Sequence, residues 1–406
     1  MSDTDTNDRV LITVTGRDRA GITATLTGIL SDQGATLHDI EQVVVQGQLT
    51  LCLLVGLSHA RDVLKELLFA AKELGMELDF KPVAPAPAPG AASGVTPVEA
   101  GRRYVITAIG RSLGANHLHA LAKALASEGA NIEKISRLSE GLLASVEIHA
   151  SLPLGRDREV LKRSLLAVAT NAGFDVSLQR ESLYRRSKRL VVMDMDSTLI
   201  RIEVIDELAR AAGVGDAVAR ITERAMQGEM DYDESLRQRV ALLAGLDVKV
   251  LDQIANDLPL TEGAETLIRV LKRLGFRTAV ISGGFSRAAD ALKRRLGIDY
   301  AFSNNLEIEG GKLTGRVVGP IVNAQRKAEL LELIAQLEGV LLDQVIAVGD
   351  GANDVLMLEK AGLGIAFRAK TKLREAADTN ISASGLDAIL YLLGISGREL
   401  QEVDSG

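Results

Sequence analysis

Apolar residues recur along the chain with two different periods. Before residue 180, strand-like apolar runs alternate with stretches whose apolar positions lie three or four residues apart, as in Ile22, Leu26 and Ile29. The succession of strand, helix, two strands, helix and strand occurs twice, over about residues 8–81 and 101–181. It predicts two small βαββαβ units of the ferredoxin-like type.

These two units are also similar in sequence. RVLITVTGR at residues 9–17 matches RYVITAIGR at 103–111, and SDQGATLHDIEQV from Ser31 matches SEGANIEKISRL from Ser127. Five of the eight prolines lie between the units, in residues 82–100. Because this segment is rich in Ala and Pro and has no apolar period, we expect an extended linker there.

The rest of the chain, residues 188–397, alternates continuous apolar runs with amphipathic stretches. Such runs indicate strands buried on both faces, so the pattern predicts an α/β fold with a doubly wound parallel sheet. The expected strands cover residues 190–193, 278–281, 300–302, 345–348 and 364–366. About residues 200–262, between the first two strands, have a helical pattern and predict a helical cap over the sheet.

The composition is typical of an acidic, globular protein. Of 406 residues, 47% are apolar and 25% are charged, and the net charge is −7. The acidic balance gives no electrostatic reason to bind nucleic acid. The single cysteine, Cys52, cannot form an intramolecular disulfide; we expect it to be buried and the protein to be cytoplasmic. Because the sequence shows no membrane-spanning apolar stretch and no secretory pattern, we expect no membrane association.

Carboxylates gather where predicted strands end. Asp194 and Asp196 follow the first strand in VVMDMDST, and Asp350 and Asp354 flank the turn in VGDGANDVLM. Ligands of such sheets bind beyond the C-terminal strand ends, where these groups lie. Crowded carboxylates require a cation or a shared proton to offset their repulsion. This requirement is met in a site where a nucleophilic carboxylate lies beside a hard metal ion. Helix N-caps would explain single members of this set, but hardly the whole set.

Other kinds of chemistry are excluded within residues 188–397, which contain no histidine and no cysteine. Histidine phosphoenzymes, thiolate nucleophiles and Ser-His-Asp triads all need one of those residues. Two weaker signals remain. Ser282 and Gly283 in VISGGF form a small-residue turn before a helix, where anions bind well, and Lys327 supplies a positive charge.

Together and in this order, these motifs resemble the haloacid dehalogenase superfamily. The resemblance implies that Asp194 is the nucleophile and that Asp196 is the general acid and base. It implies that the phosphoryl group is held by Ser282, Gly283 and Lys327. The second aspartate of DMDST favours phosphoester hydrolysis, since the dehalogenases of the superfamily lack it.

The same resemblance implies a Mg²⁺ site. Asp194, Asp350 and the backbone carbonyl of Asp196 would bind the ion, with Asp354 supporting them. The implied reaction begins with attack of Asp194 on a phosphate monoester. Asp196 would first protonate the leaving alkoxide and then activate the water that hydrolyses the aspartyl phosphate.

Across residues 190–397 the resemblance narrows to the phosphoserine phosphatase family. EVIDELA, AMQGEMDYDESLRQRV and LTEGAE carry it. It implies O-phosphoserine as the substrate, in the last step of serine biosynthesis. The implied substrate-binding residues are Glu203 for the ammonium group, Arg239 for the carboxylate, Met226 and Tyr232 in the closed cap, and Asn353. Two alternatives stay open. The substrate could be another phosphomonoester or a phosphoprotein, or the protein could be an amino-acid sensor with an inactive phosphatase fold.

The two N-terminal units resemble the ACT domain, a small regulatory module that binds amino acids. The turn GRDRAGI carries this resemblance, with Gly16, Asp18 and Gly21 as the regulatory-ligand residues that it implies. The second copy, GRSLGANHL, departs from the motif. We expect serine as an effector at the first turn and a homodimer assembled through about residues 8–180. The alternative is that both copies serve only in packing and dimerisation.

Overall fold

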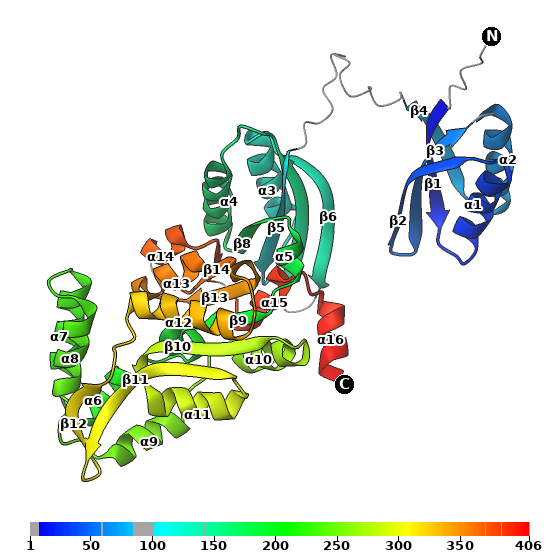
Figure 1. Cartoon of the computed structure of the whole chain (residues 1–406). Coiled ribbons are helices and arrows are strands. Elements are labelled where there is room, and N and C mark those ends of the chain that lie inside the picture. The colour runs from blue at the N-terminus through cyan, green and yellow to red at the C-terminus, as the bar shows by residue number, and fades with distance from the viewer. Residues whose placement is uncertain are drawn as a thin grey trace. The chain divides into compact units, whose positions relative to one another are not determined.

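The computed structural model describes residues 8–57, 60–83, 101–140, 143–369, 371–382 and 384–405. The chain divides between Val98 and Glu99 into two compact units (Figure 1). The segment expected as a linker, residues 82–100, lies outside the described residues except for its first two. Those two belong to a strand that ends at Val83, so regular structure continues further than the prolines suggested.

The first unit is a small antiparallel sheet with two helices. Its elements are β1 (Asp8–Arg17), α1 (Ile22–Asp32), β2 (Thr36–Val45), β3 (Gln48–Leu57), α2 (Ala60–Glu73) and β4 (Glu77–Val83). The strands lie in the order β2-β3-β1-β4, as the βαββαβ prediction requires. Ile12 and Val14 of β1 share one core with Leu26 of α1 and Leu67 of α2. Cys52 is half-buried, not buried as expected, because it lies on the less covered face of β3.

The second unit is built on one continuous eleven-stranded sheet, in the order β12-β11-β10-β9-β13-β14-β15-β8-β5-β7-β6. Its strands are β5 (Arg102–Gly110), β6 (Asn131–Glu140), β7 (Ala144–Leu152), β8 (Asp175–Arg180), β9 (Leu190–Met193), β10 (Arg277–Phe285), β11 (Tyr300–Glu309), β12 (Lys312–Val318), β13 (Val345–Gly349), β14 (Leu363–Phe367) and β15 (Thr379–Ile381). The five strands expected after residue 188 are all present.

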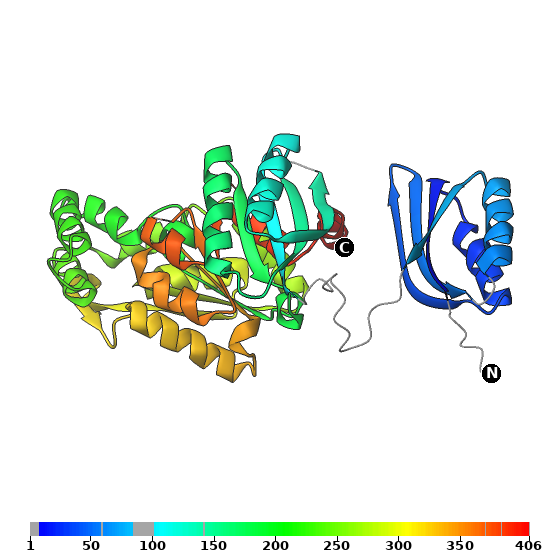
Figure 2. The same ribbon diagram turned by 90° about the horizontal axis from the view of Figure 1, so that it is seen from above.

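Helices cover this sheet. They are α3 (Ala115–Ser127), α4 (Arg158–Ala172), α5 (Leu183–Arg186), α6 (Val204–Ala211), α7 (Gly215–Met226), α8 (Tyr232–Ala241), α9 (Val248–Asn256), α10 (Ala264–Arg273), α11 (Ser286–Leu296), α12 (Ala324–Leu337), α13 (Val355–Lys360), α14 (Thr371–Ala376), α15 (Ile389–Leu392) and α16 (Gly397–Ser405). Strands β5–β8 with α3 and α4, which lie side by side in Figure 2, form the second βαββαβ unit. Among the described residues, none of the helices has the length and apolar character needed to cross a membrane.

The centre of the sheet is doubly wound, as expected. Strand β9 is parallel to β10 on one side and to β13 on the other. Its side chains alternate between two cores: Leu190 and Val192 pack with residues of α12 and α13, whereas Val191 and Met193 pack with residues of α10 and α11. Because both faces are buried, all four residues of this strand are apolar. Helices α6–α9 follow β9 in the chain and lie together near β12 (Figure 1).

The second βαββαβ unit is joined directly to this sheet, a feature that local sequence patterns did not indicate. Strand β8 pairs antiparallel with β15 where Ser177 lies opposite Thr379, and their hydroxyl oxygens are 2.6 Å apart. Gln179 Nε2 donates to the carbonyl oxygen of Leu392 at 3.1 Å. Buried Arg185, just after β8, pairs with Glu147 of β7. The described residues between 101 and 405 therefore form one packed body.

Candidate active site

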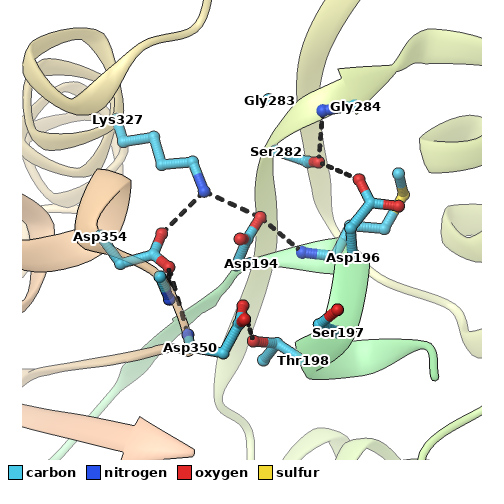
Figure 3. A network of polar contacts seen from close by, with 12 residues as sticks. Asp194, Asp196, Ser197, Thr198, Ser282, Gly283, Gly284, Lys327, Asp350 and Asp354 are labelled. Atoms are coloured by element: carbon cyan, nitrogen blue, oxygen red, sulfur yellow. Dashed lines mark hydrogen bonds and ion pairs between the residues drawn. The ribbon is translucent and has the colours of Figure 1, made fainter. Parts of the chain in front are cut away.

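The sequence motifs converge at the C-terminal ends of β9, β10 and β13 (Figure 3). They lie around a cavity of about 860 Å³. The expected site residues that line it are Asp194, Asp196, Glu203, Met226, Tyr232, Arg239, Ser282, Gly283, Asp350 and Asn353. Lys327 and Asp354 are fully buried beside it. The structure thus brings together every residue that the sequence proposed for catalysis, metal binding and substrate binding.

Lys327 connects two of the aspartates. Its Nζ lies 2.8 Å from Asp194 Oδ1 and 2.7 Å from Asp354 Oδ1 (Figure 3). Burial lowers the pKa of Lys327, but the charges of Asp194 and Asp354 more than offset this and raise the pKa above its usual range. A buried lysine with two carboxylate partners is charged and fixed in place. Asp354 Oδ2 also accepts hydrogen bonds from the backbone N–H groups of Asp350 and Gly351, so its carboxylate is fully engaged.

The acidic cluster carries more negative charge than Lys327 neutralises. Carboxylate oxygens of Asp194, Asp350 and Asp354 lie within 4.8 Å of one another. Burial raises the pKa of Asp194, and the charge of Asp354 adds to this; burial likewise raises the pKa of Asp350 to about 7. Thr198 Oγ1 donates to Asp350 Oδ1 at 3.2 Å and orients it. An oxygen-only donor set with excess negative charge fits a hard divalent cation such as Mg²⁺.

Asp196 faces a different set of partners. Its Oδ1 accepts a hydrogen bond from the backbone N–H of Val204, the first residue of α6, at 3.0 Å, and its Oδ2 accepts one from Ser282 Oγ at 3.3 Å. Burial, followed by the charge of Glu203, raises the pKa of Asp196 to about 7. A carboxyl group with a pKa in this range can both give and take a proton near neutral pH.

The turn after β10 is shaped by close contacts. Gly284 N donates to Ser282 Oγ at 2.8 Å, and a side chain at Gly283 would collide with the hydroxyl of Tyr232. The carbonyl oxygen of Gly283 accepts hydrogen bonds from Tyr232 at 3.3 Å and from Asn304 Nδ2 at 2.7 Å. Glycine is therefore required where the cap approaches this turn.

Asn304 is a site residue that the sequence reading missed. Besides bonding Gly283, its Oδ1 accepts the backbone N–H of Val322 at 2.8 Å, so it joins the β10 turn to the segment before α12. It is almost completely buried. The available signal was its position in SNNL, directly after the predicted strand at 300–302, where a polar residue ends an apolar run.

The expected substrate residues surround the cavity with different degrees of exposure. Glu203 Oε1 accepts a hydrogen bond from Ser197 Oγ at 2.7 Å. The Nε of half-buried Arg239 donates to the carbonyl oxygen of Ser235, and within the described part of the chain its guanidinium forms no ion pair. Met226 is 62% exposed, so it borders the opening and is not enclosed by the cap.

The residues expected to bind an effector lie in the first unit. Gly16 is the residue before the last one of β1, and a side chain at this position would collide with Met76. Gly21 precedes α1 with a φ of 95°, a left-handed conformation that favours glycine. Asp18 is exposed, and its backbone N–H donates to the carbonyl oxygen of Gly47. Packing and backbone geometry thus account for both glycines, and their role in ligand binding stays a prediction.

Comparisons with known proteins agree with this organisation. A family model described as haloacid dehalogenase-like hydrolase matches residues 188–362, and two ACT domain models match residues 8–81 and 103–179. A solved structure of a probable phosphoserine phosphatase from Vibrio cholerae, in unliganded form, is 36% identical with a TM-score of 0.60. That alignment covers 73% of this chain and 88% of the other.

Two curated relatives match almost from end to end. The phosphoserine phosphatase of Streptomyces coelicolor is 43% identical over 100% of this chain and 97% of its own. Phosphoserine phosphatase SerB2 of Mycobacterium tuberculosis is 43% identical over 98% of this chain and 96% of its own. Since this likeness includes both N-terminal units as well as the hydrolase fold, the chain belongs to the phosphoserine phosphatase family, as a haloacid dehalogenase-like hydrolase that carries two ACT domains.

Proposed function

We propose that the protein is a Mg²⁺-dependent phosphatase that converts O-phosphoserine to serine and phosphate through an aspartyl phosphate on Asp194. The observation that carries this proposal is the set of hydrogen bonds made by the Asp194 carboxylate. Its Oδ1 accepts hydrogen bonds from Met195 N at 2.7 Å and from Lys327. Oδ2 is then the oxygen available for attack, and Asp194 lines the cavity together with Asp196, Ser282 and Asp350.

Attack of one anion on another requires compensation of charge. Lys327, held beside Asp194, offsets the charge of the entering phosphoryl oxygens, and the hydroxyl of Ser282, which Gly284 N holds in place, would offer them a hydrogen bond. Mg²⁺, held by Asp194, Asp350 and the backbone carbonyl of Asp196, would supply further charge neutralisation at the phosphoryl group. Asp354 would keep Lys327 and the turn at residues 350–351 in place through its three hydrogen bonds.

Asp196 performs the two proton transfers. In the first step the Asp194 oxygen forms a bond to phosphorus, the bond from phosphorus to the serine oxygen breaks, and the proton of Asp196 goes to that oxygen. In the second step a water oxygen attacks phosphorus and the bond to Asp194 breaks, while Asp196 accepts the proton of the water. A pKa near 7 suits both directions of transfer.

The substrate is supported by the relatives' names and by two charges at the cavity. Arg239 offers a guanidinium that suits a carboxylate, and Glu203 offers a carboxylate that suits an ammonium group. A small zwitterionic phosphomonoester matches both. We further infer that the reaction is the last step of serine biosynthesis in the cytoplasm. Serine would act as a feedback effector through the first ACT domain, in a homodimer assembled through the N-terminal domains.

The test is phosphate release from O-phosphoserine and from phosphoethanolamine, which lacks the carboxylate, with and without Mg²⁺. We expect Mg²⁺-dependent release with a strong preference for O-phosphoserine. Asp194→Asn should abolish turnover, and Asp196→Asn should lose most of it while binding stays nearly intact. Asp290→Asn, which changes an exposed aspartate of α11 outside the cavity, is the matched control. Turnover of Asp194→Asn within about tenfold of normal, ~1.4 kcal/mol in barrier, would refute the covalent route.

A further inference from the structure

A second cavity, of about 250 Å³, lies where the second ACT domain meets the catalytic sheet. One wall is formed by the last turns of α4 and the start of β8, and the other by α14 and β15. Leu166, Ala169 and Val176 are apolar residues of its lining, and Asp175, Arg374 and Asn380 are polar ones. None of these residues belongs to the active-site cavity.

Two polar groups of this cavity lack partners. Arg374 is half-buried, and among the described residues its guanidinium makes no ion pair and no hydrogen bond. Asn380 is only 6% exposed; its Nδ2 donates to the carbonyl oxygen of Arg374 at 3.0 Å, while its Oδ1 is buried without a described partner. Buried acceptors are nearly always paired in folded proteins, so Asn380 Oδ1 indicates that a hydrogen-bond donor binds here, and half-buried Arg374 is available to pair with an anion.

The lining of the cavity carries both signs of charge. Arg374 is positive and suits a carboxylate. Negative charge comes from Asp175 and from the C-terminus of α4, which carries the negative pole of the helix dipole. The carboxylate of Asp175 already accepts hydrogen bonds from Ser382 N at 2.8 Å and from Ser382 Oγ at 2.9 Å, so it contributes its charge from a fixed position.

We propose that this cavity is a binding site for a small aliphatic α-amino acid. The carboxylate of the ligand pairs with Arg374, its ammonium group lies near the end of α4 and Asn380 Oδ1, and its side chain packs against Leu166 and Val176. This site is distinct from the active site and from the turn at residues 16–21. The proposal stands independently of the substrate of the phosphatase.

The cavity is also placed to influence the active site. Helix α14 separates the two cavities: Leu373 lines the active-site cavity, and the next residue, Arg374, lines the one described here. A ligand that fixes Arg374 therefore restrains the helix that carries Leu373. Because coupling between two sites is reciprocal, phosphate bound in the active site changes the affinity for the amino acid by the same factor.

The binding test uses the full chain and L-valine as the probe, with the thermal unfolding midpoint measured as a function of ligand concentration. Isovalerate, which lacks the ammonium group, and isobutylamine, which lacks the carboxylate, are the paired controls. We expect saturable stabilisation by L-valine alone. Arg374→Gln should weaken binding about tenfold or more, the usual scale for a lost charge-assisted hydrogen bond. Arg163→Gln, on an exposed part of α4 outside the cavity, should leave binding unchanged.

A second variant covers the case in which Arg374→Gln unfolds. Thr170→Phe places bulk at an exposed position on the rim of the cavity without removing a charge, and it should block binding. Absence of saturable stabilisation by L-valine, equal stabilisation by isovalerate, or unchanged binding to Thr170→Phe would overturn the site. For the coupling, L-valine should shift the KM or kcat for p-nitrophenyl phosphate about fivefold or more, and no shift in either would overturn it.

Discussion

At the scale of single residues, Asn304 shows how one buried side chain holds two segments of the candidate active site together. It satisfies the carbonyl oxygen of Gly283, in the turn proposed to hold the phosphoryl group, and the N–H of Val322, shortly before the helix that carries Lys327. These backbone groups belong to segments far apart in the sequence. We therefore expect Asn304 to fix the distance between the phosphate turn and the lysine.

Asn304→Ala should leave the N–H of Val322 unpaired and the carbonyl oxygen of Gly283 with only its longer hydrogen bond from Tyr232, at a cost of about 1–3 kcal/mol in the free energy of unfolding. Turnover should fall as well, with kcat affected more than KM, because Lys327 and Ser282 lose their relative placement. Asn304→Asp retains the acceptor for Val322 N but not the donor for Gly283, so it should be intermediate in stability. Its exposed neighbour provides the control: Asn305→Ala should change stability by less than about 0.5 kcal/mol. Equal behaviour of the two alanine variants would contradict this role.

The sequence identified those site residues that are charged and directly follow a predicted strand. Asp194, Asp196 and Asp350 are charged groups directly after apolar runs, and the structure places all three at the cavity. Asn304 was not found because its importance lies in its partners, Gly283 and Val322, and no local spacing connects these three positions. Contacts of this kind are set by tertiary packing.

At the scale of elements, polar contacts hold the cap against the core. Asn323 Nδ2 donates to Asp233 Oδ1 of α8 at 3.1 Å, and Arg287 of α11 pairs with Asp252 of α9 at 2.6 Å. Asn323 also caps α12, since its Oδ1 accepts the N–H of Arg326. The position of α8 over the cavity is thus linked to the start of the helix that carries Lys327.

Asp233→Ala should weaken this attachment of the cap. A part-buried hydrogen bond contributes about 0.5–1.5 kcal/mol, so kcat/KM should fall about threefold to tenfold while the unfolding midpoint changes little. Glu234→Ala removes the same charge from the next position of α8, where, within the described part of the chain, the side chain bonds only Gln238 of its own helix. If both variants lose the same activity, net charge and not the contact with Asn323 explains the effect.

The predicted elements were correct where the local pattern was strong. Strand β9 has the bounds that were expected, because four apolar residues buried on two faces leave little ambiguity. Strand β12 was missed: LTGRVV contains a glycine and lies at the edge of the sheet, half exposed. Strand β15 was missed because its three residues become a strand through pairing with β14 and β8, which lies about 200 positions earlier.

At the scale of the whole molecule, the two ACT domains are not equivalent. The first belongs to a separate compact unit, whereas the second shares its sheet with the catalytic part. Tyr391 donates to Ser139 across this junction at 3.2 Å, and Arg158 pairs with Asp378 at 3.1 Å. The two copies therefore require separate tests.

Removal of the first copy should be tolerated. A chain that begins at Glu99 should keep its unfolding midpoint and its phosphatase activity, and it should lose any non-competitive inhibition by serine that depends on the turn at residues 16–21. A chain that begins at Ser182 should be much less stable, because it exposes Thr379 and leaves buried Arg185 without Glu147. Scanning calorimetry and initial rates at several serine concentrations measure both effects. Undiminished stability of the shorter chain would show that the shared sheet is energetically unimportant.

The pairing of β8 with β15 also has a consequence for synthesis of the protein. At a rate of about 5–20 residues per second, the roughly 200 residues between these strands take on the order of 10–40 s to be made on the ribosome. During this interval the second ACT domain can fold, but one edge of its sheet has no neighbour, which is a hazard for pairing with other nascent chains. Ser177 and Gln179, which later bond Thr379 and Leu392, are polar and stay hydrated until then. Their polarity would thus protect the growing chain before it serves the finished fold.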